Sequence, residues 1–214
     1  MGLYSKAALG LLLARFVWHY SISSVTPTPL CLAANKGDLT KGDLTAVQAL
    51  LNSGAKPHEG WKLDRQGVLG AMTPLFVAAD NGHEAVVQAL LNSGANPNHG
   101  VKLGPLGVVL TTMPLLTAAE GGHEAVVKAL LAAGAKLGKG LTVGPLGCIL
   151  TGAPLKVAAD KGHEDVVKAL LASGANPDAP RFLFFRAFGA TPLQIADIEG
   201  REAIAKLLRE ARRR

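Results

Sequence analysis

Residues 82–97 read GHEAVVQALLNSGANP, and the same pattern returns twice more at intervals of 40 residues. The later copies are GHEAVVKALLAAGAKL from residue 122 and GHEDVVKALLASGANP from residue 162. Pro74, Pro114 and Pro154 keep the same spacing, and Pro192 follows 38 residues after the third of them. Self-similarity at a fixed period of this length indicates a repeat protein, in which each unit buries its apolar face against its neighbours.

Each unit predicts two short antiparallel helices. Thr73 suits the cap of the first helix, and the Pro that follows is tolerated at the first helical position. Glu84 suits the first turn of the second helix, because the helix dipole favours a carboxylate there. Gly94 is expected to end that helix in a left-handed conformation. Apolar residues at helical spacing, such as Leu130 and Leu131, are predicted to lie in the buried seam between units.

The units resemble the ankyrin repeat, whose pattern runs TPL, AA, GH, VV, LL, GA and then Asn. The resemblance covers residues 28 to about 210 in five copies. It implies an all-α solenoid of stacked helix pairs with extended β-hairpin fingers on one side, and a family role in protein recognition. The repeat domain is expected over residues 27–214, with approximate repeats at 27–71, 72–111, 112–151, 152–189 and 190–214.

Two departures from the family pattern concern the first helix. The family's Thr is lost at Met113 and Ala153, and because a capping side chain contributes about 1 kcal/mol, these two repeats are expected to depend more on stacking. The family's His after TPL is absent from every copy, where the chain has Cys31, Phe76, Leu116, Lys156 and Gln194. Both departures bear on local stability and leave the fold prediction unchanged.

The first copy also contains the tandem duplication KGDLTKGDLT at residues 36–45. Removing one KGDLT restores its alignment with the later copies. The duplication is therefore expected to lie in the turn between the two helices, where added loop length costs little.

The 40-residue period exceeds the ordinary ankyrin unit of about 33 residues, and the surplus lies in the loops between repeats. The loops WKLDRQGVL, VKLGPLGVVL and LTVGPLGCIL, which begin at residues 61, 101 and 141, each place two β-prone arms around a turn. Fingers of neighbouring repeats are expected to lie side by side as a strand wall, with Leu106 and Leu146 at their tips. No apolar run approaches the roughly 20 residues of a membrane-spanning helix.

Two interpretations of the apolar fingers stay open. Their side chains either pack on one another and on the helices, or leave an exposed patch for a partner, because monomers rarely expose a large apolar patch without a use. The connection at residues 180–190 adds four of the six Phe residues of the chain. The candidate partner-binding residues lie on the fingers and on the concave helix face: Trp61, Arg65, Phe76, Leu106, Leu116, Leu146, Lys156, Phe182, Phe184 and Phe185.

No arrangement of residues indicates catalysis or metal binding. His83, His123 and His163 occupy the family's GH position, where the resemblance implies that His braces the turn between the helices. Successive repeats lie on the order of 10 Å apart, which is too far for shared metal ligands. GPLG lacks the Lys and the Ser or Thr of a phosphate-binding loop, and no nucleophile, His and carboxylate set is recognisable. The sequence therefore predicts a protein without enzymatic activity, cofactor or metal.

The net charge of +6 is concentrated at the C-terminal end, where residues 201–214 hold six basic residues against Glu202 and Glu210. Without interleaved aromatic residues this pattern is typical of a solvated helix end whose cations offset the helix dipole, so nucleic acid is not the expected partner. The main prediction is a scaffold that binds another protein. The alternatives are a structural module that self-associates through the hairpin wall, and a basic adaptor for nucleic acid or a membrane surface.

Residues 1–26 have two interpretations. The apolar run AALGLLLA at residues 7–14 suits a degenerate half-repeat that caps the solenoid, and Leu13 precedes Pro29 by 16 residues, a normal ankyrin span. The other interpretation is a secretion or organelle-targeting leader. Against it, Arg15 interrupts the apolar run and no clear A-x-A cleavage site follows.

Cys31 and Cys148 are too few and too isolated for a disulfide framework or a zinc site. Their number fits a reducing compartment. We therefore expect a cytoplasmic protein, or a secreted or organelle-targeted one if residues 1–26 are a leader.

Overall fold

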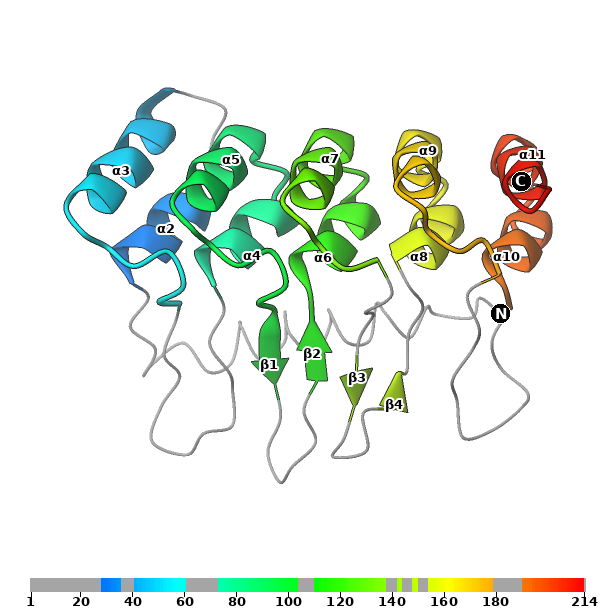
Figure 1. Cartoon of the computed structure of the whole chain (residues 1–214), viewed down its shortest axis with the longest axis horizontal. Coiled ribbons are helices and arrows are strands. Elements are labelled where there is room, and N and C mark those ends of the chain that lie inside the picture. The colour runs from blue at the N-terminus through cyan, green and yellow to red at the C-terminus, as the bar shows by residue number, and fades with distance from the viewer. Residues whose placement is uncertain are drawn as a thin grey trace.

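The computed structural model describes residues 28–35, 41–60, 73–103, 110–137, 142–143, 148–149, 154–178 and 190–213. Within these ranges the chain forms helix pairs stacked in one row (Figure 1), which confirms the predicted all-α solenoid. From the first pair to the fifth, the helices are α2 (Pro29–Asn35) with α3 (Lys41–Asn52), α4 (Pro74–Asp80) with α5 (Glu84–Asn92), α6 (Pro114–Gly121) with α7 (Glu124–Ala132), α8 (Pro154–Lys161) with α9 (Glu164–Ala172), and α10 (Pro192–Ile198) with α11 (Glu202–Ala211).

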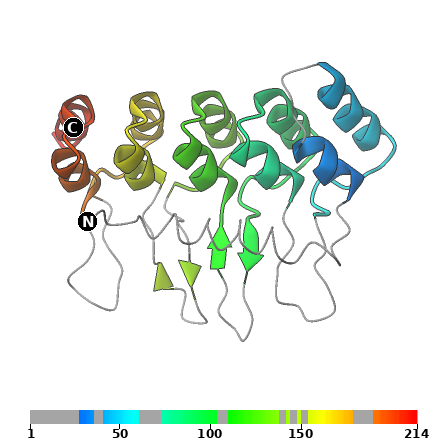
Figure 2. The ribbon, with the colours of Figure 1, turned by 180° about the vertical axis from the view of Figure 1, so that it is seen from behind.

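The helices form two layers. In Figure 1 the first helices of the pairs make one layer and the second helices make the other. Each helix packs against its pair partner and against the corresponding helix of the neighbouring pair. Figure 2 shows the same two layers from behind, with the strands beyond the layer of first helices.

The first helices begin as predicted where Thr is present. The Thr73 hydroxyl caps α4 by accepting a hydrogen bond from the backbone amide three residues on (3.2 Å). Thr191 and Gln194 form a capping box at α10, in which each side chain accepts from the backbone amide of the other residue. Met113 precedes α6 without a side-chain cap, so this helix depends more on packing. Ala153 lies outside the described residues.

The buried core consists of the facing sides of the helices. Leu90, Leu130 and Leu170 are fully buried at equivalent places in the second helices, where neighbouring pairs meet. This confirms the predicted seam for Leu130. Leu131 is only half-buried, because it lies on the flank of α7 and not on the face turned inward.

Histidines at the start of the second helices link each pair to the preceding one. His123 Nε2 donates a hydrogen bond to the carbonyl oxygen of Asp80 (3.2 Å), and His163 Nε2 donates to the carbonyl oxygen of Glu120 (3.0 Å). These carbonyls belong to the last turn of a first helix, which the helix itself leaves unpaired. The resemblance implied a brace within one pair, whereas the structure places the hydrogen bond between pairs. We call these contacts the carbonyl rungs.

The Gly that precedes each His has a matching role. Gly82 and Gly122 have positive φ angles of 75° and 73°, which disfavour other residues. A Cβ atom on them would also lie 2.5 Å and 2.6 Å from Nδ1 of His123 and His163, respectively. Gly82 and Gly122 therefore leave room for the His of the next pair, and Gly162 leaves room for Arg201. This spatial relation explains why the two residues recur together.

The fingers between the second and fourth pairs form one small sheet. Strand β1 (Val101–Leu103) pairs antiparallel with β2 (Leu110–Thr112), and β3 (Thr142–Val143) pairs antiparallel with β4 (Cys148–Ile149). Strands β2 and β3 pair through Thr111 and Thr142, which gives the order β1-β2-β3-β4. Fingers of neighbouring pairs therefore lie side by side as predicted. The finger tips at residues 104–109 and 144–147 lie outside the described residues.

The second KGDLT copy is helical, which corrects the expectation that it lies in a turn. Helix α3 begins at Lys41 and has 12 residues, whereas α5, α7 and α9 have 9. Gly42 is helical, whereas Gly82 at the corresponding turn of the second pair has a positive φ angle. Without that left-handed break, α3 starts three residues earlier than its counterparts. Residues 36–40 lie outside the described ranges.

Candidate protein-interaction surface

Hydrogen bonds fix the segments that lead from the second helices toward the fingers. Thr28 Oγ1 donates to the carbonyl oxygen of Glu59 (3.3 Å), and Thr73 Oγ1 donates to the carbonyl oxygen of His99 (3.5 Å). The capping hydroxyl therefore also ties the departing loop to its own pair. Met113 has no hydroxyl at the same place, so the third pair lacks this tie.

A second set of contacts joins these segments to the following pair. Asn98 Oδ1 accepts a hydrogen bond from the Lys136 amide (2.8 Å), and Asn98 Nδ2 donates to the carbonyl oxygen of Gly134 (3.1 Å). Later in the chain Asp178 accepts a hydrogen bond from Arg212 Nε (2.9 Å). The bases of the fingers are therefore positioned by the pairs on both sides.

Three carboxylates occupy equivalent positions near the C-terminal ends of the first helices. We call Asp80, Glu120 and Asp160 the carboxylate row. The pKa of the Glu120 carboxyl is raised, mainly because burial disfavours its charged form. Asp80 and Asp160 raise this pKa further, and Lys161 opposes the rise, so the carboxylates are close enough to affect one another. Sequence reasoning missed this row, although an acidic residue before each NG, GG or KG recurs every 40 residues.

The exposed face of the second helices is largely paired within each helix. Lys128 Nζ lies 2.6 Å from a Glu124 oxygen, and Lys168 Nζ lies 2.8 Å from a Glu164 oxygen. These exposed pairs contribute little stability, since solvent screens them. They do balance the charge of this face, which makes it a weak candidate for recognising a charged partner.

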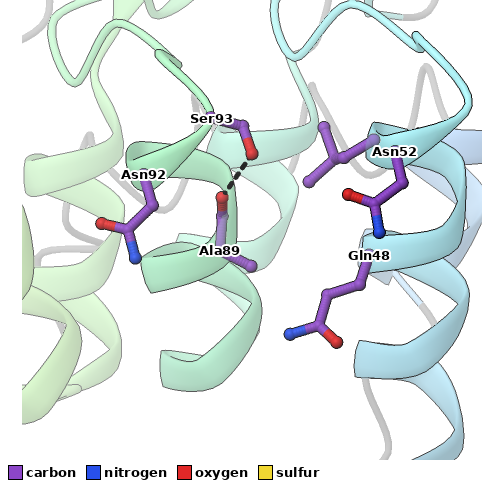
Figure 3. A pocket seen from close by; sticks show the side chains of 6 residues that line it. Gln48, Asn52, Ala89, Asn92 and Ser93 are labelled. Carbon is purple, nitrogen blue, oxygen red and sulfur yellow. Dashed lines mark hydrogen bonds between the residues drawn. The ribbon is translucent and has the colours of Figure 1, made fainter.

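A hollow of about 280 Å³ with mixed polar and apolar walls lies between α3 and α5 (Figure 3). Its walls carry the amide side chains of Gln48, Asn52 and Asn92. The Ser93 hydroxyl donates to the carbonyl oxygen of Ala89 (2.9 Å), so it is already used within α5. Because no ionisable group lines the hollow, it offers hydrogen bonds but no acid, base or metal ligand set.

The structure places three of the ten predicted partner-binding residues. Phe76 and Leu116 are only 4% and 6% exposed, so as placed they offer almost no contact area to a partner. They fill the place of the family's His and pack inside the layer of first helices. Lys156 is half-buried on α8, and it already interacts with another part of the chain. The other seven lie outside the described residues: Trp61, Arg65, Leu106, Leu146, Phe182, Phe184 and Phe185.

Searches for two other kinds of site find nothing in the part of the chain that the structure describes. No group of three His, Cys, Asp or Glu side chains there is arranged to hold a metal ion. None of the described helices is long and apolar enough to cross a membrane.

Comparisons with known proteins agree with the architecture. A family model described as ankyrin repeats (3 copies) matches residues 7–101 and 107–181. A second model, described as ankyrin repeats (many copies), matches residues 155–209. No curated protein matches the chain.

Proposed function

Because the chain belongs to the ankyrin repeat family, we propose that it is a non-catalytic scaffold that binds another protein through its hairpin fingers and the concave face of its first helices. Members of this family are generally protein-interaction modules. One observation carries the proposal for this chain. Fingers of adjacent pairs join through Thr111 and Thr142 into one sheet, which presents a continuous surface beyond the helices.

Among the described residues, each helix packs against its pair partner and against the corresponding helix of the neighbouring pair. The described core residues belong to the helices and to the short turns that end them. The carbonyl rungs also join helix to helix. These contacts account for the stacking of the described helices, and the loops that project beyond a rigid stack are the segments that commonly carry recognition.

The second-layer face supports the proposal by contrast. Its ion pairs, such as Lys128 with Glu124, are satisfied within one helix. The carboxylate row, by comparison, brings the carboxyl groups of three pairs close enough to affect one another. A partner that contacts the fingers and the first helices would therefore meet this row, and complementary charge on the partner would add selectivity.

The test separates folding from binding. We would replace residues 101–112 and 141–150 by ordinary short ankyrin turns and use Lys128→Gln, on the opposite face, as the matched control. The expected result is unchanged helical circular dichroism for both variants. Proteins that are retained by the immobilised wild-type chain and by the control should be lost from the shortened chain. Unfolding of the shortened chain, or full retention of its partners, would contradict the proposal.

Self-association through the hairpin sheet is the second candidate, favoured by the same pairing of β2 with β3. Light scattering of the wild-type chain over a range of concentrations distinguishes the two. A mass that rises with concentration, and falls to that of a monomer in the finger-shortened chain, would favour self-association. For the basic-adaptor alternative, Arg209 and Arg212 already pair with Asp197 and Asp178, which lowers the charge available to a polyanion.

A further inference from the structure

The first helix pair exposes a side chain that every following interior pair buries. Leu32 on α2 is 40% exposed. Its equivalents Val77, Thr117 and Val157 are 3%, 4% and 7% exposed. The difference arises from position in the row, because the second, third and fourth pairs each have a preceding pair on that side and the first pair has none among the described residues.

Helix α3 shows the same loss of cover. Ala46 is exposed, whereas its equivalents Val86 and Val126 are buried. Leu50 is half-buried, whereas Leu90 and Leu130 at the same place are fully buried. Two helices therefore present one apolar face where a preceding pair would lie. We call Leu32, Ala46, Ala49 and Leu50 the open face.

The opposite end of the row is unsuited to cover the open face of a second copy. Arg209 on α11 stands where the interior pairs have Leu91, Leu131 and Leu171, and it is exposed. Gln194 on α10 is exposed as well. Head-to-tail stacking of two copies would bury Arg209 and its partner Asp197 against Leu32 and Ala46, and removing a charged pair from water costs free energy.

The chain itself supplies a segment with the right pattern and length. Residues 6–14 read KAALGLLLA, and α7 reads EAVVKALLA. In this alignment Leu9 and Leu12 take the places of the buried Val127 and Leu130, and Gly10 takes the place of an exposed lysine. The family model that matches the repeats also begins its match at residue 7.

From these observations we propose that residues 7–14 occupy the open face as the second helix of an incomplete repeat. Leu13 then faces Ala49 and Leu50 of α3, as Leu51 of α3 faces Ala89 of α5. The segment that leads on to Thr28 provides the connection, since Leu13 precedes Pro29 by 16 residues. Under this proposal residues 7–14 are a structural part of the solenoid and are retained in the mature protein.

Hydrogen exchange of the full chain tests the proposal, with Leu13→Asp as the disrupting variant. Loss of docking should make the amides of α2 and α3 exchange about tenfold faster, because repeat proteins open from uncovered ends. The amides of α7 and α9 should keep their wild-type rates, which shows that the rest of the solenoid stays folded. The milder Leu13→Ala should give a smaller acceleration at the same amides.

Gly10→Lys is the matched control, because it places a lysine where α7 and α9 have exposed lysines. A docked helix tolerates this change, so exchange should stay as in the wild type. The same charge would interrupt the apolar run of a targeting leader. Three results would overturn the proposal: unchanged exchange in Leu13→Asp, a mature chain that begins after residue 14 by mass spectrometry, or protection of α2 and α3 that depends on protein concentration.

Discussion

The two ends of the helix row differ in chemistry although they share one fold. The first pair presents the apolar side chains of Leu32 and Leu50 at its outer face. The last pair presents Arg209, which is bonded to Asp197 over 2.7 Å, at a place where interior pairs have Leu. A terminal repeat needs a polar outer face to stay soluble. By that criterion α11 has a polar residue typical of a terminal pair at its outer face, whereas α2 and α3 have the surface of an interior pair.

Hydrogen bonds from two arginines also join the last pair to the preceding part of the chain. Arg201 replaces the His of the GH motif, and its Nη2 donates to the carbonyl oxygen of Asp160 over 2.7 Å. Arg212 bonds to Asp178 of the preceding segment. Charged donors make stronger hydrogen bonds than neutral ones. The arginines that gave the C-terminal end its basic character therefore serve, in part, to hold the final pair in place.

The largest expected effect contrasts the middle of the row with the open face. Leu130→Ala removes a fully buried side chain and should lower the free energy of unfolding by about 2 to 5 kcal/mol. Leu50→Ala should cost a similar amount in the full chain if residues 7–14 cover it. After removal of residues 1–14 the Leu50→Ala loss should fall well below that of Leu130→Ala. Urea unfolding measures all of these values, and a loss below about 0.5 kcal/mol for Leu130→Ala would contradict the seam.

A smaller effect compares one glycine inside the row with its equivalent at the end. Gly122 and Gly200 both have positive φ angles, 73° and 67°, so Ala at either position is strained. Only at Gly122 would the new Cβ meet a neighbour, namely the His163 ring. We expect Gly122→Ala to cost about 1 to 3 kcal/mol, and Gly200→Ala to cost less, because no following pair covers it. Equal losses in thermal unfolding would mean that the carbonyl rung tolerates the added methyl.

The pH dependence of stability tests Glu120, the middle member of the carboxylate row. Burial raises the pKa of Glu120 above its usual value near 4.5, so the folded state favours the protonated carboxyl. Its contribution to stability is greatest below pH 4.5 and is lost as pH rises through the higher folded pKa. Glu120→Gln should therefore be more stable than the wild type at pH 7, by less than about 1 kcal/mol because the carboxyl is partly solvated. The advantage should vanish below pH 4.5, and an advantage that persists in acid would exclude titration of Glu120 as its cause.

Sequence patterns predicted the parts of this molecule that depend on periodic burial and local turns. Leu130 and Thr73 behave as expected, because helical spacing and capping are properties of short stretches. The acceptor of His123 could not be predicted, because it depends on how one pair sits on another. The helical KGDLT copy was assigned to a turn because length alone does not show whether a helix extends into an insertion. The sequence shows the carboxylate row as a repeated acidic residue. That these carboxyl groups affect one another could not be predicted, because it depends on the distance between neighbouring pairs.

The smallest expected effect on stability would make the two ends alike. Arg209→Leu restores the residue of the interior pairs at the outer face of α11. Its ion pair with Asp197 joins side chains that are about half exposed, so its loss should change the free energy of unfolding by less than about 1 kcal/mol. The change should instead promote association of two copies. The last pair would gain an apolar side chain at its outer face, and Leu193 of this pair is already only partly buried. Arg213→Leu, which removes the same charge from an exposed site beyond α11, is the control. Light scattering should show a concentration-dependent mass for Arg209→Leu and a monomer for Arg213→Leu. If both variants stay monomeric, the polarity of Arg209 is not what keeps the C-terminal ends of two copies apart.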